Sequence, residues 1–538
     1  MRKLLSRGIA LMLVMVMVLA LAACGGGNDT PDQGNQPSNN TPSPGGSDST
    51  EPDGEKVSSK DTMIVAIDRE PASMDPAGNT VSMKRLMENA IYDTLLKFDS
   101  ELTPTAALAE SWEQLDDLTW QFNLREGVLF HNGEEMKASD VVYSFKRLED
   151  HATSAPNVAK LDLDALEAKD DYTVILKTTE PYAFLEALLC NQGMSIVNEN
   201  VVSAAGENYG REPIGTGPFK FVSWAAGDNI VIERNDDYWG DVALLKTITF
   251  RIITEAASRT IDLESGGVDM NLLVSATDAD RIDSSPDTQL FRNTTTNIRY
   301  IAFNTQKDVF KDKLVRQAFY HATDVDIIRE VVYTSNYSAP AISPVGPGLP
   351  GRNENLEPYT YDIEKAKQLL ADAGYPNGVE VEFMYLANSQ NNMLAEMLMD
   401  MWKDAGITLV LKPTESATLT SALNAGEHEM CSAGTSFQLV DPGDGLYRFF
   451  HTDNMNASTS RSKLSNPDID ALLDQIIVTT DAEKRNQMVK DVQVLIHEEA
   501  PFIYLAHPMG LVGASSNLRG FNTVVTSMYD FNYVYFVE

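Results

Sequence analysis

The sequence is poor in cysteine, and this shortage excludes two kinds of site. Three cysteines occur among 538 residues, Cys24, Cys190 and Cys431, and no pair has the CxxC spacing. A thiolate zinc site and a thioredoxin-type redox motif are therefore excluded. Two interpretations of Cys190 and Cys431 stay open. They form a disulfide with each other, or each is a small apolar side chain buried on its own.

Positive charge is also scarce. The chain has 42 Lys and Arg against 78 Asp and Glu, which gives a formal net charge of −36. Binding of nucleic acid depends on clustered basic side chains, so this balance argues against a nucleic-acid partner. A strongly acidic surface is typical of a secreted protein that stays soluble through its solvated charges.

Catalytic and metal-binding motifs are missing as well. The sequence has no GxSxG, no Walker A motif and no HExxH, and its seven histidines form no i,i+4 pair. His497 is followed by two glutamates, as in a zinc helix, but Pro501 occupies the place of the second histidine. We therefore expect no catalytic residue, no metal and no cofactor. A secreted hydrolase whose catalytic residues are dispersed in the sequence stays as the alternative.

The first residues have the pattern of an export signal. Arg2, Lys3 and Arg7 precede an apolar run that ends in Leu21-Ala22-Ala23-Cys24. That run has about 15 residues, fewer than the ~20 that a membrane-spanning helix needs. A cysteine directly after Leu-Ala-Ala resembles the lipobox of bacterial lipoproteins. The resemblance implies a signal peptide over 1–23, lipidation of Cys24, and a protein held at the extracytoplasmic face of the cell membrane.

A polar segment separates this signal from the rest. Residues 24–60 consist mostly of Gly, Asn, Pro, Ser, Thr, Asp and Glu. Such a segment buries too little apolar surface to offset its chain entropy, so we predict a disordered tether.

The remainder has the pattern of an α/β protein with mixed sheets. Residues 379–386 predict a strand, 392–405 an amphipathic helix ended by Gly406, and 407–412 a second strand. This order implies a parallel strand pair with a right-handed crossover. Further strands are predicted at 63–67, 119–124, 173–177, 230–233, 247–253, 299–303 and 502–505, and further helices at 362–373, 468–478 and 482–499.

A series of motifs in this part resembles family 5 solute-binding proteins, the oligopeptide-, dipeptide- and nickel-binding subunits of ABC importers. The motifs occur in the family's order and span about 62 to 510: Ser73–Pro76, Ala109–Trp112, Leu118–Val128, Phe130–Gly133, Lys137–Phe145, Pro213–Phe219, Val315–Phe319, Tyr361–Gly374 and Asp441–Pro442. From the residue types, Trp112 and Trp120 are expected to pack in a core, and Asp140 to cap a helix from Val141.

The resemblance implies a fold of the type II periplasmic-binding-protein class, with two lobes joined by a hinge and an extra subdomain. Lobe I is expected to comprise 61–97, 212–304 and 508–538, the inserted subdomain 98–211, and lobe II 305–507. A monomer that closes on an extended solute by rigid-body motion is expected. Its partners would be the permease subunits of the importer.

Peptide binders of this family hold the ligand's amino terminus with an aspartate four residues before the later proline, and here that position is Gln438. The dipeptide binders also hold the ligand carboxylate with an arginine, and here that position is Tyr385. Both end contacts are therefore predicted to be absent, which favours a ligand whose amino terminus is blocked, internal or missing. A different acid, such as Asp444, is the alternative.

The candidate ligand-binding residues follow from position along the chain. They lie in a segment after the first strand, in the strand at 379–386, and in a segment after a later strand: Val81, Ser82, Tyr385, Phe437, Gln438, Leu439 and Asp441. For Phe437 a place in the core is an equal alternative, and Asp441 has a structural alternative. Within the binding class, an oligosaccharide or a nickel chelate replaces the peptide as the alternative ligand; His451 is the histidine near the loop.

Overall fold

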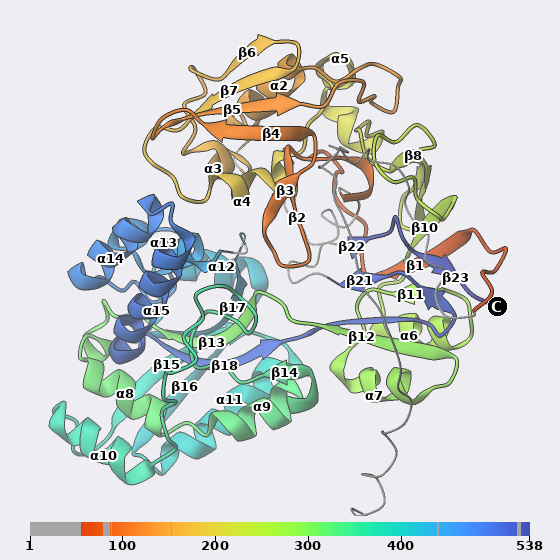
Figure 1. The fold of residues 1–538 in the computed structure, drawn as a ribbon. Helices are drawn as coiled ribbons and strands as arrows, with labels where there is room; N and C mark the ends of the chain where they lie inside the picture. Colours follow the sequence, from red (N-terminus) through yellow and green to blue (C-terminus); the bar gives the residue numbers. More distant parts are fainter. Residues whose placement is uncertain are drawn as a thin grey trace, which may run out of the picture. The chain divides into compact units, whose positions relative to one another are not determined.

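The computed structural model describes residues 55–78, 87, 89–151, 153–437, 439, 441–523 and 529–538. Its largest sheet has seven strands in the order β12-β19-β11-β1-β10-β9-β8 (Figure 1). The strands are β1 (Thr62–Ile67), β8 (Phe219–Ala225), β9 (Asn229–Arg234), β10 (Thr247–Ile252), β11 (Met270–Asn271), β12 (Thr288–Asn293) and β19 (Gly510–Ser515). Strand β1 pairs in parallel with both β10 and β11, while β8, β9, β12 and β19 run antiparallel to their neighbours.

A second sheet has six strands in the order β14-β18-β13-β17-β15-β16. They are β13 (Asn297–Phe303), β14 (Ser338–Ala339), β15 (Val379–Leu386), β16 (Ile407–Thr414), β17 (Met430–Ser436) and β18 (Phe502–Pro508). The predicted parallel pair is confirmed, because β15 and β16 align in parallel from Val379–Ile407 to Leu386–Thr414. Between them runs α11 (Ser389–Lys403), which begins three residues before the predicted start.

Two chain crossings connect these sheets. Strand β12 ends at Asn293 and β13 begins at Asn297, while β18 ends at Pro508 and β19 begins at Gly510. The crossings are tied together, since the Thr295 hydroxyl donates to the Pro508 carbonyl at 2.7 Å and Asn293 is the strand partner of Gly510. The first crossing lies earlier than the expected boundary at 304, because β13 pairs with β17 and β18 and not with the seven-stranded sheet.

A four-stranded sheet, ordered β4-β5-β7-β6, lies within the expected subdomain. Its strands are β4 (Ala109–Gln114), β5 (Thr119–Leu124), β6 (Glu167–Asp170) and β7 (Thr173–Lys177). Helix α2 (Ala138–Glu149) starts three residues before Val141, the start that a cap at Asp140 predicts. The Asp140 carboxylate still serves the helix start, because it accepts from the Lys137 backbone N–H at 2.9 Å, and this is why the residue type suggested a cap.

Three small two-stranded pairs complete the strands: β2 (Leu96–Phe98) with β3 (Pro104–Ala106), β20 (Leu518–Arg519) with β23 (Tyr535–Phe536), and β21 (Asn522–Thr523) with β22 (Tyr529–Asp530). The other α-helices are α3 (Ala155–Val158), α4 (Leu185–Leu189), α5 (Glu199–Ala205), α6 (Ala256–Glu264), α7 (Ala276–Ser284), α8 (Lys313–His321), α9 (Val325–Tyr333), α10 (Ile363–Asp372), α12 (Ser416–Asn424), α13 (Pro442–Phe450), α14 (Pro467–Val478) and α15 (Ala482–Glu499).

Helices cover both faces of the six-stranded sheet (Figure 1). On one face, the Trp402 ring of α11 packs edge-on against Phe319 of α8, and Phe319 packs on Phe303 of β13. On the other face, Phe450 of α13 contacts Phe502 of β18. Burial of such rings stabilises this lobe, by about 1.5–3 kcal/mol for each fully buried side chain.

The subdomain contacts the helices on that second face through the segment that leads into α4. The Ala183 N–H donates to the Ile477 carbonyl of α14 at 2.9 Å, and the Tyr182 hydroxyl donates to Asp444 of α13 at 3.4 Å. The Phe184 ring lies 5.3 Å beneath the Arg485 guanidinium of α15. The subdomain and the six-stranded lobe therefore share one apolar cluster.

The two expected core tryptophans are half-buried against that same cluster. The Trp112 indole N–H donates to Glu186 of α4 at 2.7 Å, and Trp120 stacks on Phe122. Both cysteines of the described body, Cys190 and Cys431, are buried and free, which favours the apolar interpretation over a disulfide. Cys24 and the predicted signal and tether lie outside the described residues, apart from 55–60.

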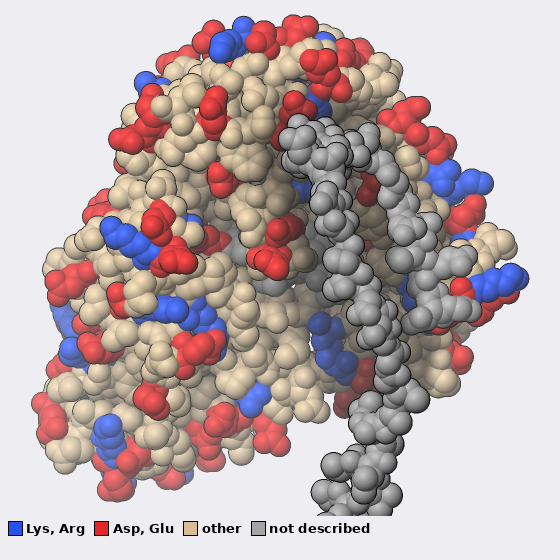
Figure 2. All heavy atoms as spheres, in the orientation of Figure 1, with Lys and Arg blue, Asp and Glu red and all other residues tan. Residues whose placement is uncertain are grey.

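On the face shown in Figure 2, acidic side chains are scattered over the described residues, with Lys and Arg between them. No helix within the described ranges is long and apolar enough to cross a bilayer.

Candidate functional site

Four candidate residues lie in the described part of the chain: Tyr385 near the end of β15, and Phe437, Leu439 and Asp441 after the end of β17. These two strands run in parallel, so both end at the same edge of the six-stranded sheet, at Leu386 and Ser436. We call this the carboxyl edge. It lies beside the first chain crossing, because Asn297 at the start of β13 is the strand partner of Ser436. In open α/β sheets, ligands bind at the carboxyl ends of the strands.

The Phe437 side chain points from this edge into the core. It is 4% exposed, and its ring centroid lies 5.6 Å from that of Phe449 in α13. A side chain on Gly445 would collide with the Phe437 ring, so the glycine makes room for it. Leu439 is also 4% exposed. The structure thus favours the core alternative for Phe437, and contact of either side chain with ligand stays a prediction.

The acids near this loop have partners within the chain. Asp441 caps α13 by accepting from the Gly443 N–H at 3.0 Å, and its other oxygen accepts from Arg485 at 3.0 Å. Asp444, the alternative acid for a ligand ammonium, is buried and pairs with Arg448 at 2.7 Å. Both carboxylates therefore have a structural role that a ligand ammonium would have to disrupt.

Tyr385 lies on the face of the sheet that α11 covers. Strand registers place it on the same side as Ser432 of β17, and Ser432 donates to Asn391 in the first turn of α11 at 3.4 Å. The Tyr385 ring tilts against Phe383 at 5.2 Å, and burial raises the pKa of its hydroxyl. Val81, Ser82 and Gln438 lie outside the described residues, and their roles stay predictions.

One charged side chain at this edge was not among the predicted site residues. Arg299 of β13 is directly opposite Gly434 of β17, and Gly434 has no side chain to block it. A Cβ on Gly434 would lie 2.2 Å from Arg299 Nη1, so the guanidinium lies over that glycine. A signal was present in the sequence, since an arginine interrupts the otherwise apolar run Ile298–Phe303, but the family pattern drew attention to Tyr385.

The nickel-chelate alternative would need imidazole side chains at this edge. Within the described ranges, no three His, Cys, Asp or Glu side chains are grouped so as to hold a metal ion. His451, the candidate for a nickel chelate, is buried, and it stacks on Tyr447 at 4.3 Å.

A buried histidine lies beside the chain crossings. His507 of β18 has its two ring nitrogens 3.1 Å from the Asn297 carbonyl and 3.2 Å from the Ser343 carbonyl. Burial lowers the pKa of His507 to about 4, and it lowers those of His131 and His428 to about 4 as well. Their folded-state pKa values thus lie below the ordinary 6.5, so the unfolded chain takes up protons first as the pH falls.

Stability is therefore expected to be highest above pH 6.5 and to fall as the pH drops from 6.5 toward 4, by about 3 kcal/mol for each histidine. Urea unfolding at pH 7.5, 5.5 and 4.5 measures this loss. His507→Gln should reduce the slope of unfolding free energy against pH. An unchanged slope in that variant would show that His507 does not contribute.

The fold and the comparisons with known proteins agree. Two sheets joined by two crossings, with a subdomain inserted, define a solute-binding protein of the type II periplasmic class, and the solved structure reported below shares this fold. The chain matches the model for bacterial extracellular solute-binding proteins, family 5, over residues 103–457, and it belongs to this family of ABC-importer binding proteins.

Individual relatives extend the match over most of the chain. Heme-binding protein A of Haemophilus influenzae is 32% identical over 87% of this chain and 90% of its own length. The dipeptide-binding protein of Escherichia coli is 28% identical over 80% of this chain and 86% of its own. The ABC transporter-associated periplasmic binding protein DppA of Helicobacter pylori, solved with the peptide STSA, matches with a TM-score of 0.78 and 28% identity, covering 90% of this chain and 99% of that one.

Proposed function

We propose that this protein captures a peptide outside the cytoplasm and delivers it to the permease of an ABC importer, without transforming it. The two chain crossings beside the carboxyl edge are the observation that carries the proposal. They permit the seven-stranded and six-stranded lobes to close on a solute as rigid bodies. Relatives named for dipeptides, oligopeptides and glutathione support a peptide ligand.

Several finer features belong to the same proposal. The signal sequence would export the chain, and lipidation at Cys24 would hold it at the membrane through the tether. Lobe I would comprise 61–97, 212–293 and 510–538, lobe II 297–508, and the subdomain 98–211. The protein would act as a monomer, with the permease as its partner.

The ligand's amino terminus is proposed to be blocked, internal or absent. An ammonium is bound best by a carboxylate, because charge-assisted hydrogen bonds are about twice as strong as neutral ones. Asp441 and Asp444 are each paired with an arginine of the chain. Neither is free to hold a ligand ammonium without losing that pair.

Mass spectrometry of ligand released from the full-length protein after purification tests this function. We expect peptides in about one copy per chain, with an amino terminus that is modified or closed into a ring. Release of an oligosaccharide or a nickel chelate in their place would overturn the peptide class. A homogeneous free-amino peptide of fixed length would overturn the prediction for the amino terminus alone.

A further inference from the structure

Arg299, at the carboxyl edge, forms no ion pair with any carboxylate in the described part of the chain. Among the residues that the structure describes, its hydrogen bonding is limited to one long contact, from Nη1 to the neighbouring Ile298 carbonyl at 3.5 Å. Most arginines of this acidic protein have a carboxylate close by, as Arg147 has Asp75 and Arg448 has Asp444. A half-buried guanidinium without a counter-charge costs free energy. A bound anion would remove this cost, which suggests that Arg299 has a partner outside the chain.

Solvent reaches the surface around Arg299. Gly434, over which the guanidinium lies, is exposed, and so is Ser436 farther along the same face of β17. Tyr333, the last residue of α9, lies close enough for the Arg299 charge to lower its pKa slightly against the larger effect of burial. The guanidinium is thus bounded by the sheet and the end of α9, and solvent reaches this part of the sheet at Gly434 and Ser436.

The start of α11 adds a second source of positive potential. Asn391 of its first turn contacts Ser432, which is two residues from Gly434 on the same face of β17. Helix α11 has 15 residues and no acidic side chain in its first turn. A helix N-terminus carries partial positive charge, which attracts an anion when no acidic side chain of its own neutralises it.

We propose that Arg299 binds a carboxylate of the solute, with the first turn of α11 alongside. This rests on the proposed function, and it names the group that the six-stranded lobe recognises. A guanidinium presents two parallel N–H donors that match a carboxylate. Arg299 would replace the carboxylate-binding arginine of the dipeptide binders, whose position is Tyr385 in this chain. Tyr385 lies in β15 and Arg299 in β13, and these two strands flank β17.

Peptide libraries that differ in one charge test the assignment. The full-length protein, stripped of ligand by unfolding and refolding, is mixed with random peptides of two to five residues that are acetylated at the amino terminus. The peptides carry either a free carboxyl terminus or a terminal amide. Retained peptides are separated and quantified by mass spectrometry. A third library carries the terminal amide and one fixed glutamate, so that a side-chain carboxylate is distinguished from the chain end.

Wild-type protein should retain the free acids about 10- to 100-fold better than the amides, the ratio expected for a charge-assisted hydrogen bond. Arg299→Gln should abolish this preference, and Arg299→Lys should restore part of it. Arg251→Gln is the matched control, because Arg251 is also a strand arginine, in β10 of the seven-stranded sheet, but pairs with Asp262 of α6. Better retention of the glutamate library than of the plain amide library would place a side-chain carboxylate at Arg299.

The possible failures are distinct. If wild-type protein retains no library, the proposed peptide function fails. If it retains acids and amides equally, or if Arg299→Gln keeps the preference for acids, peptide binding stands and the role of Arg299 is wrong. Equal thermal unfolding of the three variants and wild type shows that the comparison is between folded proteins.

Discussion

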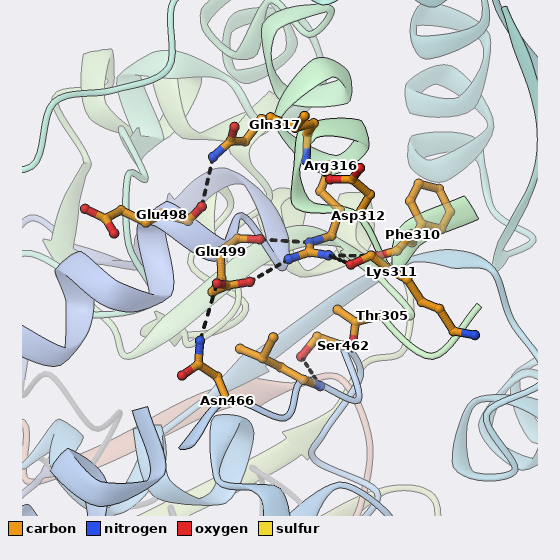
Figure 3. A network of polar contacts seen from close by, with 12 residues as sticks. Thr305, Phe310, Lys311, Asp312, Arg316, Gln317, Ser462, Asn466, Glu498 and Glu499 are labelled. Atoms are coloured by element: carbon orange, nitrogen blue, oxygen red, sulfur yellow. Dashed lines mark hydrogen bonds and ion pairs between the residues drawn. The ribbon is translucent and has the colours of Figure 1, made fainter. Parts of the chain in front are cut away.

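Replacing Arg316 with leucine is expected to destabilise the protein by about 3–5 kcal/mol, which is the usual cost of leaving one member of a buried ion pair without its partner. Arg316 is 2% exposed and pairs with Glu499 at 2.8 Å (Figure 3). Its guanidinium also donates to the backbone carbonyls of Phe310 and Glu499 at 2.7 and 2.8 Å. The variant would leave these acceptors and a carboxylate unsatisfied. Urea unfolding monitored by circular dichroism measures the loss.

Two further variants separate the pair from a general effect of substitution. Lys367→Ala breaks an exposed pair with Glu364 on α10 and should change stability by less than about 0.5 kcal/mol. Adding Glu499→Leu to Arg316→Leu removes the isolated carboxylate and should recover part of the loss. A loss below about 1 kcal/mol in Arg316→Leu would contradict the assigned role.

Replacing Asp93 with alanine should cost about 3 kcal/mol, since it leaves three donors without an acceptor. The Asp93 carboxylate accepts from the Thr216 hydroxyl at 2.8 Å, the Trp239 indole at 2.9 Å and the Tyr238 hydroxyl at 3.1 Å. Burial raises the pKa of Asp93, against the smaller opposing effect of these hydrogen bonds. Because the folded-state pKa lies above the ordinary value, wild-type protein regains stability at this one group as the pH falls through it.

Asp93→Asn keeps one acceptor and should lose less stability than the alanine variant. Asp237→Ala serves as the control, because Asp237 makes only a long, exposed pair with Lys220 at 3.6 Å and its loss should matter little. Thermal unfolding of the three variants ranks them. Equal midpoints for Asp93→Ala and Asp237→Ala would show that the cluster contributes nothing.

The clusters around Arg316 and Asp93 give a structural role to two of the family motifs. The motif Val315–Phe319 carries Arg316, whose contacts hold α8 to the end of α15. The motif Pro213–Phe219 carries Thr216 between two glycines that approach Ile91 closely: a Cβ on Gly215 would lie 2.1 Å from the Ile91 carbonyl oxygen. Both motifs are structural, as the residue types suggested for the motifs around Trp112 and Trp120.

Regular elements were predicted well because their signals are local. Helix α10 has its cap at Asp362 as expected, the Asp362 carboxylate accepting from the Lys365 N–H at 2.9 Å, and α15 spans the predicted Ala482–Glu499. Apolar periodicity and capping residues depend on neighbours within one or two turns. The lobe boundary at 304 was misplaced because assignment of β13 to a sheet depends on β17 and β18, which are distant in the sequence.

The candidate site was predicted less completely, for the same physical reason. Counting along the chain located Tyr385 and the loop after β17, but it does not tell which face of a strand a side chain occupies. Phe437 turned toward α13, while the Arg299 guanidinium lies over Gly434, its partner across the strands. Strand register decides both outcomes, and register follows from long-range pairing.

Titration of ligand-free protein with the peptide that it releases on unfolding, followed by recovery of that peptide, tests the central claim most directly. If two hinged lobes trap a solute and hand it on, calorimetry will show one saturable site per chain, and chromatography will return all of the peptide unaltered after prolonged incubation. Shortened or chemically changed peptide, at an amount that grows with time, would mean that the protein is an enzyme.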